Sequence, residues 1–276
     1  MTAHPDLPLN DGRAMPQLGL GVWRTPAEET ARVVGAALSA GYRHVDTAAI
    51  YGNEEGVGRA IAEAGAAADQ VWLTTKLWND SQGHDRALRA FDKSLQRLRR
   101  DVVDLYLIHW PAPRNDLYVE TWRALVRLKE EGRARSIGVS NFNADHLRRI
   151  VDATGVTPTV NQVELHPRFQ QRVLRQVHAE LGIATESWSP LGQAQVLDDP
   201  ALVEIARKHG KSPAQVVIRW HLDEGLIVIP KSVNPERIAQ NADVFDFTLD
   251  EHDLHRIRGL DRLDGRIGPD PETADF

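Results

Sequence analysis

Short apolar runs alternate along this chain with longer segments of helical period, and this alternation constrains the fold more than any other feature. Eight runs are expected to be β-strands: Gln17–Val22, His44–Asp46, Val71–Lys76, Val103–His109, Ser136–Val139, Val160–Glu164, Ala184–Trp188 and Ile227–Ile229. The helical segments between them are Ala27–Ala40, Glu54–Ala64, Asp85–Arg99, Val119–Glu131, Ala144–Ala153, Gln171–Leu181 and Pro213–Asp223. Strands that alternate with helices form a parallel sheet, and eight such strands close a barrel.

A doubly wound open sheet is the alternative architecture. It would be expected to carry a G-x-G-x-x-G turn after its first strand, and Gly19-Leu20-Gly21 does not continue in that way. The chain has 276 residues, enough for a closed barrel of roughly 250 residues. No linker rich in Ser, Gly or Pro divides it. We therefore predict an α/β fold in which residues 1–276 form a single (β/α)8 barrel domain.

Composition excludes several classes of function. The net charge is −6 and the pI is near 6.0, so no basic field favours nucleic acid or an anionic membrane as a partner. Cysteine is absent, which rules out disulfides, a thiolate nucleophile and cysteine-bound metals. The sequence shows no signal peptide and no run of 18 apolar residues, so a cytoplasmic location is the default expectation.

Polar and ionisable side chains follow most of the predicted strands. In a parallel barrel the active site lies at the carboxyl ends of the strands. The side chains at these positions are Asp46, Lys76, His109, Ser140, Asn141, Gln162, His166, Trp188, Lys231 and Ser232. Stability alone would not require so many polar groups at one rim. We therefore expect this rim to carry out the chemistry.

Four of the rim residues suggest acid catalysis: Asp46, Tyr51, Lys76 and His109. A phenol has a pKa of about 10 and is a weak acid at neutral pH unless a nearby cation favours its phenolate. A buried Lys76 held charged by Asp46 would supply that cation. His109 would orient a substrate oxygen. Together they predict that Tyr51 is a general acid.

Five short motifs follow one another along the chain: G-Y-R-H-V-D-T-A-A-I-Y-G-N-E-E, L-I-H-W-P, G-V-S-N-F, N-Q-V-E-L-H-P and I-P-K-S-V. Their order and spacing, from about Leu9 to Phe247, resemble the aldo/keto reductase family. The W-N-D of residues 78–80, the E-S-W-S-P-L-G of residues 186–192 and the short segment after Leu260 are similar to its bacterial 2,5-diketo-D-gluconate reductase branch.

The resemblance implies a barrel preceded by an N-terminal β-hairpin, with extra helices near the C-terminus. It also implies a monomeric oxidoreductase that reduces small aldehydes and ketones with NADPH. Matched residue by residue, Tyr51 is the general acid, Lys76 lowers its pKa, Asp46 pairs with Lys76 and His109 orients the carbonyl.

The same resemblance assigns the cofactor residues. Ser140, Asn141 and Gln162 would bind the nicotinamide carboxamide, and Trp188 would stack on its ring where most members of the family carry Tyr. The remaining cofactor residues are Leu191 and Gly192 at the pyrophosphate, Lys231, Ser232, Val233 and Arg237 at the 2′-phosphate, and Gln240 and Asn241 at the adenine. The two cations and the hydroxyl of Ser232 also suit a phosphate dianion on chemical grounds. Asn234 stands where close relatives carry Arg, so NADH is expected as a weaker alternative cofactor.

Aromatic residues on the strand-end loops predict the substrate pocket. Its candidate residues are Trp23, Trp78, Asn79, His109 and Trp110, whereas Trp72, Trp122 and Trp220 are expected to belong to the core. The segment after Leu260 is short and polar, which predicts an open pocket. No metal site is expected, because the histidines lack ligand spacing such as H-E-x-x-H.

Two other readings compete with a reductase. One is an NADPH-binding regulatory or sensor module that keeps the barrel but does not turn over, because a fold alone does not fix function. The intact set of Asp46, Tyr51, Lys76 and His109 argues against it. The other is a metal-assisted hydrolase built on Asp46, His109 and His166, which the missing ligand spacing disfavours.

Overall fold

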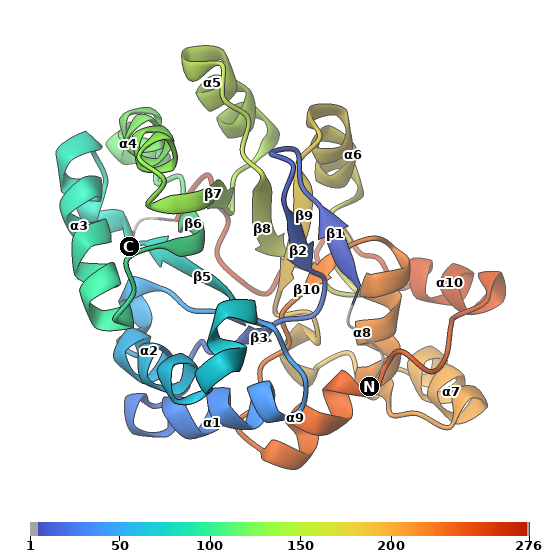
Figure 1. The fold of residues 1–276 in the computed structure, drawn as a ribbon. Coiled ribbons are helices and arrows are strands. Elements are labelled where there is room, and N and C mark those ends of the chain that lie inside the picture. Colours follow the sequence, from blue (N-terminus) through green and yellow to red (C-terminus); the bar gives the residue numbers. More distant parts are fainter. Residues whose placement is uncertain (1–4, 275) are drawn as a thin grey trace.

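The computed structural model describes residues 5–274 and 276, in which eight parallel strands form one curled sheet surrounded by helices (Figure 1). In sheet order the strands are β3 (Leu20–Gly21), β4 (His44–Asp46), β5 (Trp72–Leu77), β6 (Val103–Ile108), β7 (Ala134–Ser140), β8 (Val160–Glu164), β9 (Ala184–Trp188) and β10 (Ile227–Val228). A parallel bridge between Leu18 and Val228 closes the sheet on itself. The predicted (β/α)8 barrel is confirmed.

Helices pack around the outside of this sheet (Figure 1). They are α1 (Ala27–Ser39), α2 (Glu54–Glu63), α3 (His84–Leu98), α4 (Tyr118–Glu130), α5 (Ala144–Thr154), α6 (Arg172–Leu181), α7 (Pro200–His209), α8 (Pro213–Asp223), α9 (Pro235–Ala242) and α10 (Glu251–Arg258). Shorter 3-10 turns are η1 (Ala49–Tyr51), η2 (Gly65–Gln70), η3 (Asn79–Ser81), η4 (Pro113–Asn115) and η5 (Gly192–Ala194). None of the helices in residues 5–274 combines the length and apolar character that a membrane crossing requires.

The predicted bounds of an element agree best with the structure where a capping residue marks its end. Helix α8 has its predicted bounds because Ser212 caps it: the Ser212 hydroxyl accepts from Gln215 N, and Gln215 Oε1 accepts from Ser212 N. The first barrel strand is shorter than predicted. Gln17–Val22 was expected, but regular pairing is confined to Leu20–Gly21, since the edge facing β10 holds only the single bridge at Leu18.

An antiparallel hairpin, β1 (Asp6–Pro8) with β2 (Ala14–Pro16), precedes the barrel as predicted. Its Leu9 and Met15 are buried against residues at or near the beginnings of barrel strands, such as Trp72, Val160 and Ile227. The hairpin therefore covers the amino-terminal end of the barrel. The carboxyl ends of the strands stay available for a site.

Candidate active site

The four residues predicted to act in acid catalysis lie together at the carboxyl ends of adjacent strands. Lys76 Nζ donates to Asp46 Oδ1 at 2.5 Å and to the Thr47 carbonyl oxygen at 2.9 Å. The same nitrogen lies 5.2 Å from the centre of the Tyr51 ring, which meets the His109 ring edge-on at 5.6 Å. Asp46, Lys76 and His109 are buried, whereas Tyr51 is partly exposed.

Charge in this cluster follows from burial and from the Asp46–Lys76 pair. Burial alone would lower the pKa of Lys76, but Asp46 and Tyr51 outweigh it and leave the pKa raised, so Lys76 is a cation at neutral pH. Burial and then Lys76 hold the pKa of His109 well below its usual range. His109 is therefore neutral and can donate a ring N–H to an oxygen without adding charge.

The pKa of the Tyr51 phenol reflects two opposing effects. Lys76 was expected to lower the pKa of Tyr51. Lys76 does act in that direction, but burial is the larger effect, and the net pKa of Tyr51 is raised. The Tyr51 hydroxyl thus holds its proton in the free enzyme, and Lys76 limits the cost of releasing it.

Two residues that the sequence analysis did not single out support this cluster. Asn53 Oδ1 accepts from the Thr47 hydroxyl at 2.7 Å, and its amide donates to the Val22 carbonyl at 2.9 Å. Glu54 accepts from the Thr75 hydroxyl and from Arg97, each at 2.6 Å. Glu54 ties the loop that carries Tyr51 to the strand that carries Lys76, whereas Asn53 ties this loop to residues that follow β3 and β4. Their only sequence signal was the N-E-E end of the first motif.

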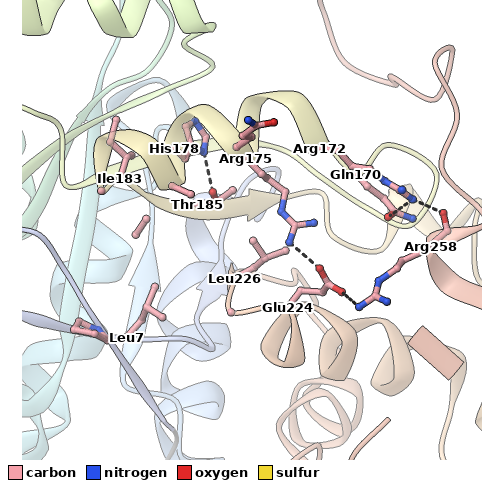
Figure 2. Close-up of a pocket in the computed structure, with 16 residues that line it drawn as sticks. Leu7, Gln170, Arg172, Arg175, His178, Ile183, Thr185, Glu224, Leu226 and Arg258 are labelled. Carbon is pink, nitrogen blue, oxygen red and sulfur yellow. Dashed lines mark hydrogen bonds and ion pairs between the residues drawn. The ribbon is translucent and has the colours of Figure 1, made fainter. Parts of the chain in front are cut away.

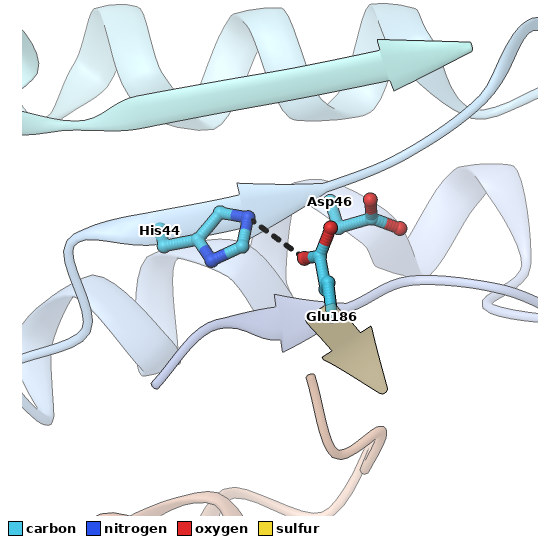
Figure 3. Close-up of side chains that lie close together, drawn as sticks. All are labelled: His44, Asp46 and Glu186. Carbon is cyan, nitrogen blue, oxygen red and sulfur yellow. Dashed lines mark ion pairs between the residues drawn. The ribbon is translucent and has the colours of Figure 1, made fainter. Parts of the chain in front are cut away.

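A second buried carboxyl group, Glu186, lies beside Asp46, and the sequence analysis assigned it no function. Figure 3 shows Glu186 reaching from β9 toward His44 and Asp46 of β4. Glu186 Oε1 lies 3.6 Å from His44 Nε2. Burial, with Lys76 nearby, lowers the pKa of His44 to about 3, so this histidine is neutral. A Cβ atom at residue 19 would overlap the His44 ring, which explains the glycine there.

His44, Asp46 and Glu186 are close enough to share an ion, but their environment does not favour one. The Lys76 ammonium already faces Asp46, and a divalent cation placed beside it would be repelled. Among the described residues, no such group joins Asp46 with His109 and His166, as the metal-hydrolase reading requires. His166 instead faces Glu164, with Nε2 and Oε1 separated by 3.1 Å.

The residues predicted to bind nicotinamide form one hydrogen-bonded group. Ser140 donates to the Gln162 carbonyl at 2.7 Å, and Asn141 Nδ2 donates to the His109 carbonyl at 2.9 Å. Trp188 Nε1 donates to Asn141 Oδ1 at 2.8 Å, which fixes the indole ring at the end of β9. The predicted residues are thus brought together beside His109.

The predicted phosphate residues lie at the start of α9. In the described part of the chain the side chains of Lys231 and Arg237 have no ion pair, so both cations are available to a ligand. Asn234 caps this helix, its Oδ1 accepting from Glu236 N at 2.8 Å and from Arg237 N at 3.2 Å. The helix N-terminus and two unpaired cations suit a phosphate.

The other predicted cofactor residues lie in the neighbouring segments. Leu191 and Gly192 stand at the start of η5, where Gly192 has a φ of +55° that favours glycine. Val233 is partly buried, and the two adenine candidates are in α9, where Gln240 is exposed and Asn241 buried.

Two of the aromatic candidates for the substrate pocket contact Phe276, a residue that the sequence analysis did not name. Phe276 stacks on Trp78 at 5.6 Å and meets Trp110 edge-on at 5.1 Å. Asn79 Nδ2 donates to the Phe276 carbonyl at 3.1 Å. Trp78 also touches His109 edge-on, at 5.2 Å between ring centres. Phe276, in the segment after Leu260, therefore packs against three of the candidate substrate residues, and an open pocket stays a prediction.

Trp23 is the substrate candidate that this aromatic group does not include. It is 42% exposed, and the Arg24 guanidinium lies 4.1 Å from its ring centre. In the described residues no ring contact joins it to Trp78 or Trp110.

A cavity of about 590 Å³ lies at the other end of the barrel, near the beginnings of β9 and β10 and beside Leu7 of the hairpin (Figure 2). Its three arginines are all paired, since Glu224 accepts from Arg175 at 2.8 Å and from Arg258 at 3.3 Å, and Arg172 lies 2.9 Å from Asp261. Among the described residues that line it there is no tyrosine and no lysine, so it lacks the pair that meets at Lys76.

Comparison with known proteins decides the family. The model of the aldo/keto reductase family matches residues 15–262. The chain belongs to the aldo/keto reductase family. An aldo-keto reductase of Mycobacterium sp. (strain JLS) is 59% identical over 272 residues, which cover 99% of this chain and 98% of that protein. The methylglyoxal reductase DkgA of Escherichia coli (strain K12) is 53% identical over 266 residues, 96% of each chain.

The fold of this aldo/keto reductase is also that of a solved relative. A mutant of Gox0644, whose structure was determined in complex with NADPH, is 59% identical, with a TM-score of 0.96 over 99% of this chain and 100% of that one. The predictions of an NADP(H)-dependent oxidoreductase and of a small carbonyl substrate are confirmed. The comparisons lend no support to a binding module without turnover.

Proposed function

We propose that this aldo/keto reductase reduces its carbonyl substrate with Tyr51 as the general acid. The observation that carries the proposal is the Lys76 ammonium, held by Asp46 at 2.5 Å and lying 5.2 Å from the Tyr51 ring centre. As the carbonyl oxygen gains negative charge, Tyr51 gives it a proton, and Lys76 stabilises the phenolate that remains. Neutral His109 donates a hydrogen bond to the same oxygen and orients it.

The residues predicted to bind the cofactor lie on or after the strands β7, β8, β9 and β10 of the same barrel. NADPH, when bound, supplies the hydride that the carbonyl carbon accepts. Ser140, Asn141 and Gln162 hold the carboxamide, and Trp188 provides a flat surface for the ring. Leu191 and Gly192 line the pyrophosphate, Lys231, Ser232, Val233 and Arg237 hold the 2′-phosphate, and Gln240 and Asn241 contact the adenine. The unpaired Lys231 and Arg237 make the fit to NADPH better than to NADH, which remains the weaker alternative.

Small dicarbonyl compounds are the proposed substrate class. Trp78 meets the His109 ring edge-on, and Phe276 packs against Trp78 and Trp110, so a small substrate at His109 would meet an aromatic surface. The name of the E. coli relative points to methylglyoxal. Reduction of 2,5-diketo-D-gluconate stays a prediction of the sequence resemblance, and a panel that holds both substrates and an aromatic aldehyde ranks them.

The Tyr51→Phe variant tests the acid. General acid catalysis contributes about 10²–10⁴-fold to a rate, so kcat is expected to fall by at least about a hundredfold, measured as NADPH consumption at 340 nm. The dissociation constant of NADPH, measured by quenching of tryptophan fluorescence, is expected to change by less than about twofold, because Phe keeps the ring. Turnover at the wild-type rate in Tyr51→Phe contradicts the proposal.

We further infer that the enzyme acts as a monomer, with a cytoplasmic location and without nucleic acid as a partner. The family resemblance implies the monomer, and the net charge of −6 opposes binding to a phosphate backbone. Sedimentation with and without NADPH tests this inference. A dimer that is required for activity contradicts it.

A further inference from the structure

The side-chain amide of Gln162 lies between two buried carboxyl groups. Its nitrogen Nε2 donates to Asp46 Oδ2 at 2.8 Å and to Glu186 Oε2 at 2.9 Å. The three side chains come from β8, β4 and β9, and none is more than 2% exposed. An amide nitrogen carries two hydrogens. These two acceptors therefore use both of them.

This arrangement determines which way the amide faces. Asp46 Oδ1 accepts from the Lys76 ammonium at 2.5 Å, and its other oxygen, Oδ2, faces the Gln162 amide and accepts a hydrogen from it. A reversed amide would place its oxygen against Asp46 Oδ2, where oxygen meets oxygen. Without Glu186, one amide hydrogen would be buried with no partner, which costs free energy. Glu186 is thus what completes the orientation.

The opposite side of the amide is left as an acceptor. In the described part of the chain, Gln162 Oε1 accepts no hydrogen bond. The residue pairs in register with Ser140 of β7 on one side and with Glu186 of β9 on the other. The amide groups of the nearby Asn141 are engaged by Trp188, His109 and Ser140. Gln162 therefore offers an unused carbonyl oxygen on a strand that lies between those of Ser140 and Trp188.

We propose that Glu186 is a positioning residue: by accepting the second hydrogen of the Gln162 amide, it keeps Oε1 turned toward the cofactor site, where Oε1 accepts from the NH2 group of the nicotinamide carboxamide. The inference rests on the proposed placement of nicotinamide beside Gln162. It gives a function to a buried acid that the reduction step does not use.

The protonation state of Glu186 agrees with this role. Burial, with Asp46 beside it, raises the pKa of Glu186 to about 8, so at neutral pH the carboxyl group carries its proton. Oε2 accepts from Gln162 whether or not the proton is present. Two like charges around one amide are avoided.

The test compares NADP⁺ with its 3-acetylpyridine analogue, in which a methyl group replaces the carboxamide NH2. Wild-type enzyme is expected to bind NADP⁺ about tenfold more tightly than the analogue, the ratio that one hydrogen bond supplies. Glu186→Leu is expected to reduce this ratio to about twofold or less. Glu186→Gln keeps an acceptor oxygen for Gln162 and is expected to restore at least half of the wild-type ratio.

Binding is measured by quenching of tryptophan fluorescence, so no turnover is needed. Glu186→Met replaces Glu186→Leu if the latter does not fold, as judged by circular dichroism. Gln162→Leu separates the two proposals. If Gln162→Leu abolishes the discrimination and Glu186→Leu keeps it, Glu186 does not position the amide and the inference is wrong. If Gln162→Leu also keeps the wild-type ratio, the carboxamide contact itself is wrong, and the inference fails with it.

Discussion

At the scale of single residues, the centre of this barrel holds more ionisable groups than proton transfer requires. Lys76, Asp46 and Glu186 are packed into one buried network with the neutral His44. The Lys76 ammonium needs one negative partner, and Asp46 supplies it. The raised pKa of Glu186 keeps this second carboxyl group neutral near pH 7. The network therefore presents a charged Lys76 to Tyr51 without a surplus of buried negative charge.

The pKa of Glu186 makes the stability of the enzyme depend on pH. Its pKa is about 8 in the folded chain and 4.5 ordinarily, so its contribution to stability is complete below pH 4.5 and is lost as the pH rises toward 8. Glu186→Gln does not titrate. The Tm of Glu186→Gln relative to wild type is therefore expected to rise between pH 5 and pH 8, by at least about 2 °C, and to level off above that. A Tm difference that stays constant between pH 5 and pH 8 contradicts the raised pKa of Glu186.

The sequence could place Asp46, Lys76 and His109 because each ends a recognisable buried strand. It could not assign a function to Glu186, which lies inside the predicted strand Ala184–Trp188 and whose partners are far away in the chain. An acidic residue within a buried strand was the available signal. The direction of the net pKa shift of Tyr51 could not be predicted from the sequence either, because it depends on how far burial outweighs the effect of Lys76.

At the scale of elements, the segment after α10 is held across the rim by hydrogen bonds that no periodicity shows. Glu164 accepts from Ile267 N at 2.6 Å and from Gly268 N at 2.7 Å, at the carboxyl end of β8. A Cβ atom at Gly268 would lie 2.5 Å from the Trp188 ring, so glycine allows the close passage. The barrel strands and helices could be predicted from their apolar patterns. The path of the segment after α10 could not, because it is fixed by hydrogen bonds of its backbone amides, which leave no pattern in the sequence.

The Phe276→Ala variant tests whether this segment shapes the pocket. Loss of the ring removes an apolar surface beside Trp78 and Trp110, so kcat/KM for methylglyoxal is expected to fall about three- to tenfold. The ratio of kcat/KM for an aromatic aldehyde to that for methylglyoxal is expected to rise. Leu263→Ala is the matched control, because Leu263 lies on the same segment and is fully exposed. An unchanged substrate ranking in Phe276→Ala would show that the ring does not line the pocket.

At the scale of the whole molecule, the hairpin and the chemistry occupy opposite ends of one barrel. Separate core clusters contain Trp122, Trp220 and Trp72, and they share the strands of the same closed sheet. A closed sheet has no edge at which one part could unfold while the rest stays paired. The prediction of a single domain over residues 1–276 follows from this topology, and cooperative unfolding tests it.

The Met15→Ala variant tests two statements: that the chain unfolds as one domain, and that the hairpin lies at the end of the barrel away from the cofactor site. Met15 is fully buried beneath the strand beginnings, and removal of such a side chain costs about 2–5 kcal/mol of the free energy of unfolding. Denaturant curves followed by tryptophan fluorescence and by far-ultraviolet circular dichroism are expected to coincide in the wild type and to shift together in Met15→Ala. The dissociation constant of NADPH, measured well below the transition, is expected to stay within about twofold, because the hairpin lies at the end away from Lys231 and Gln162. Transitions that separate between the two probes would show that the chain does not unfold as one domain.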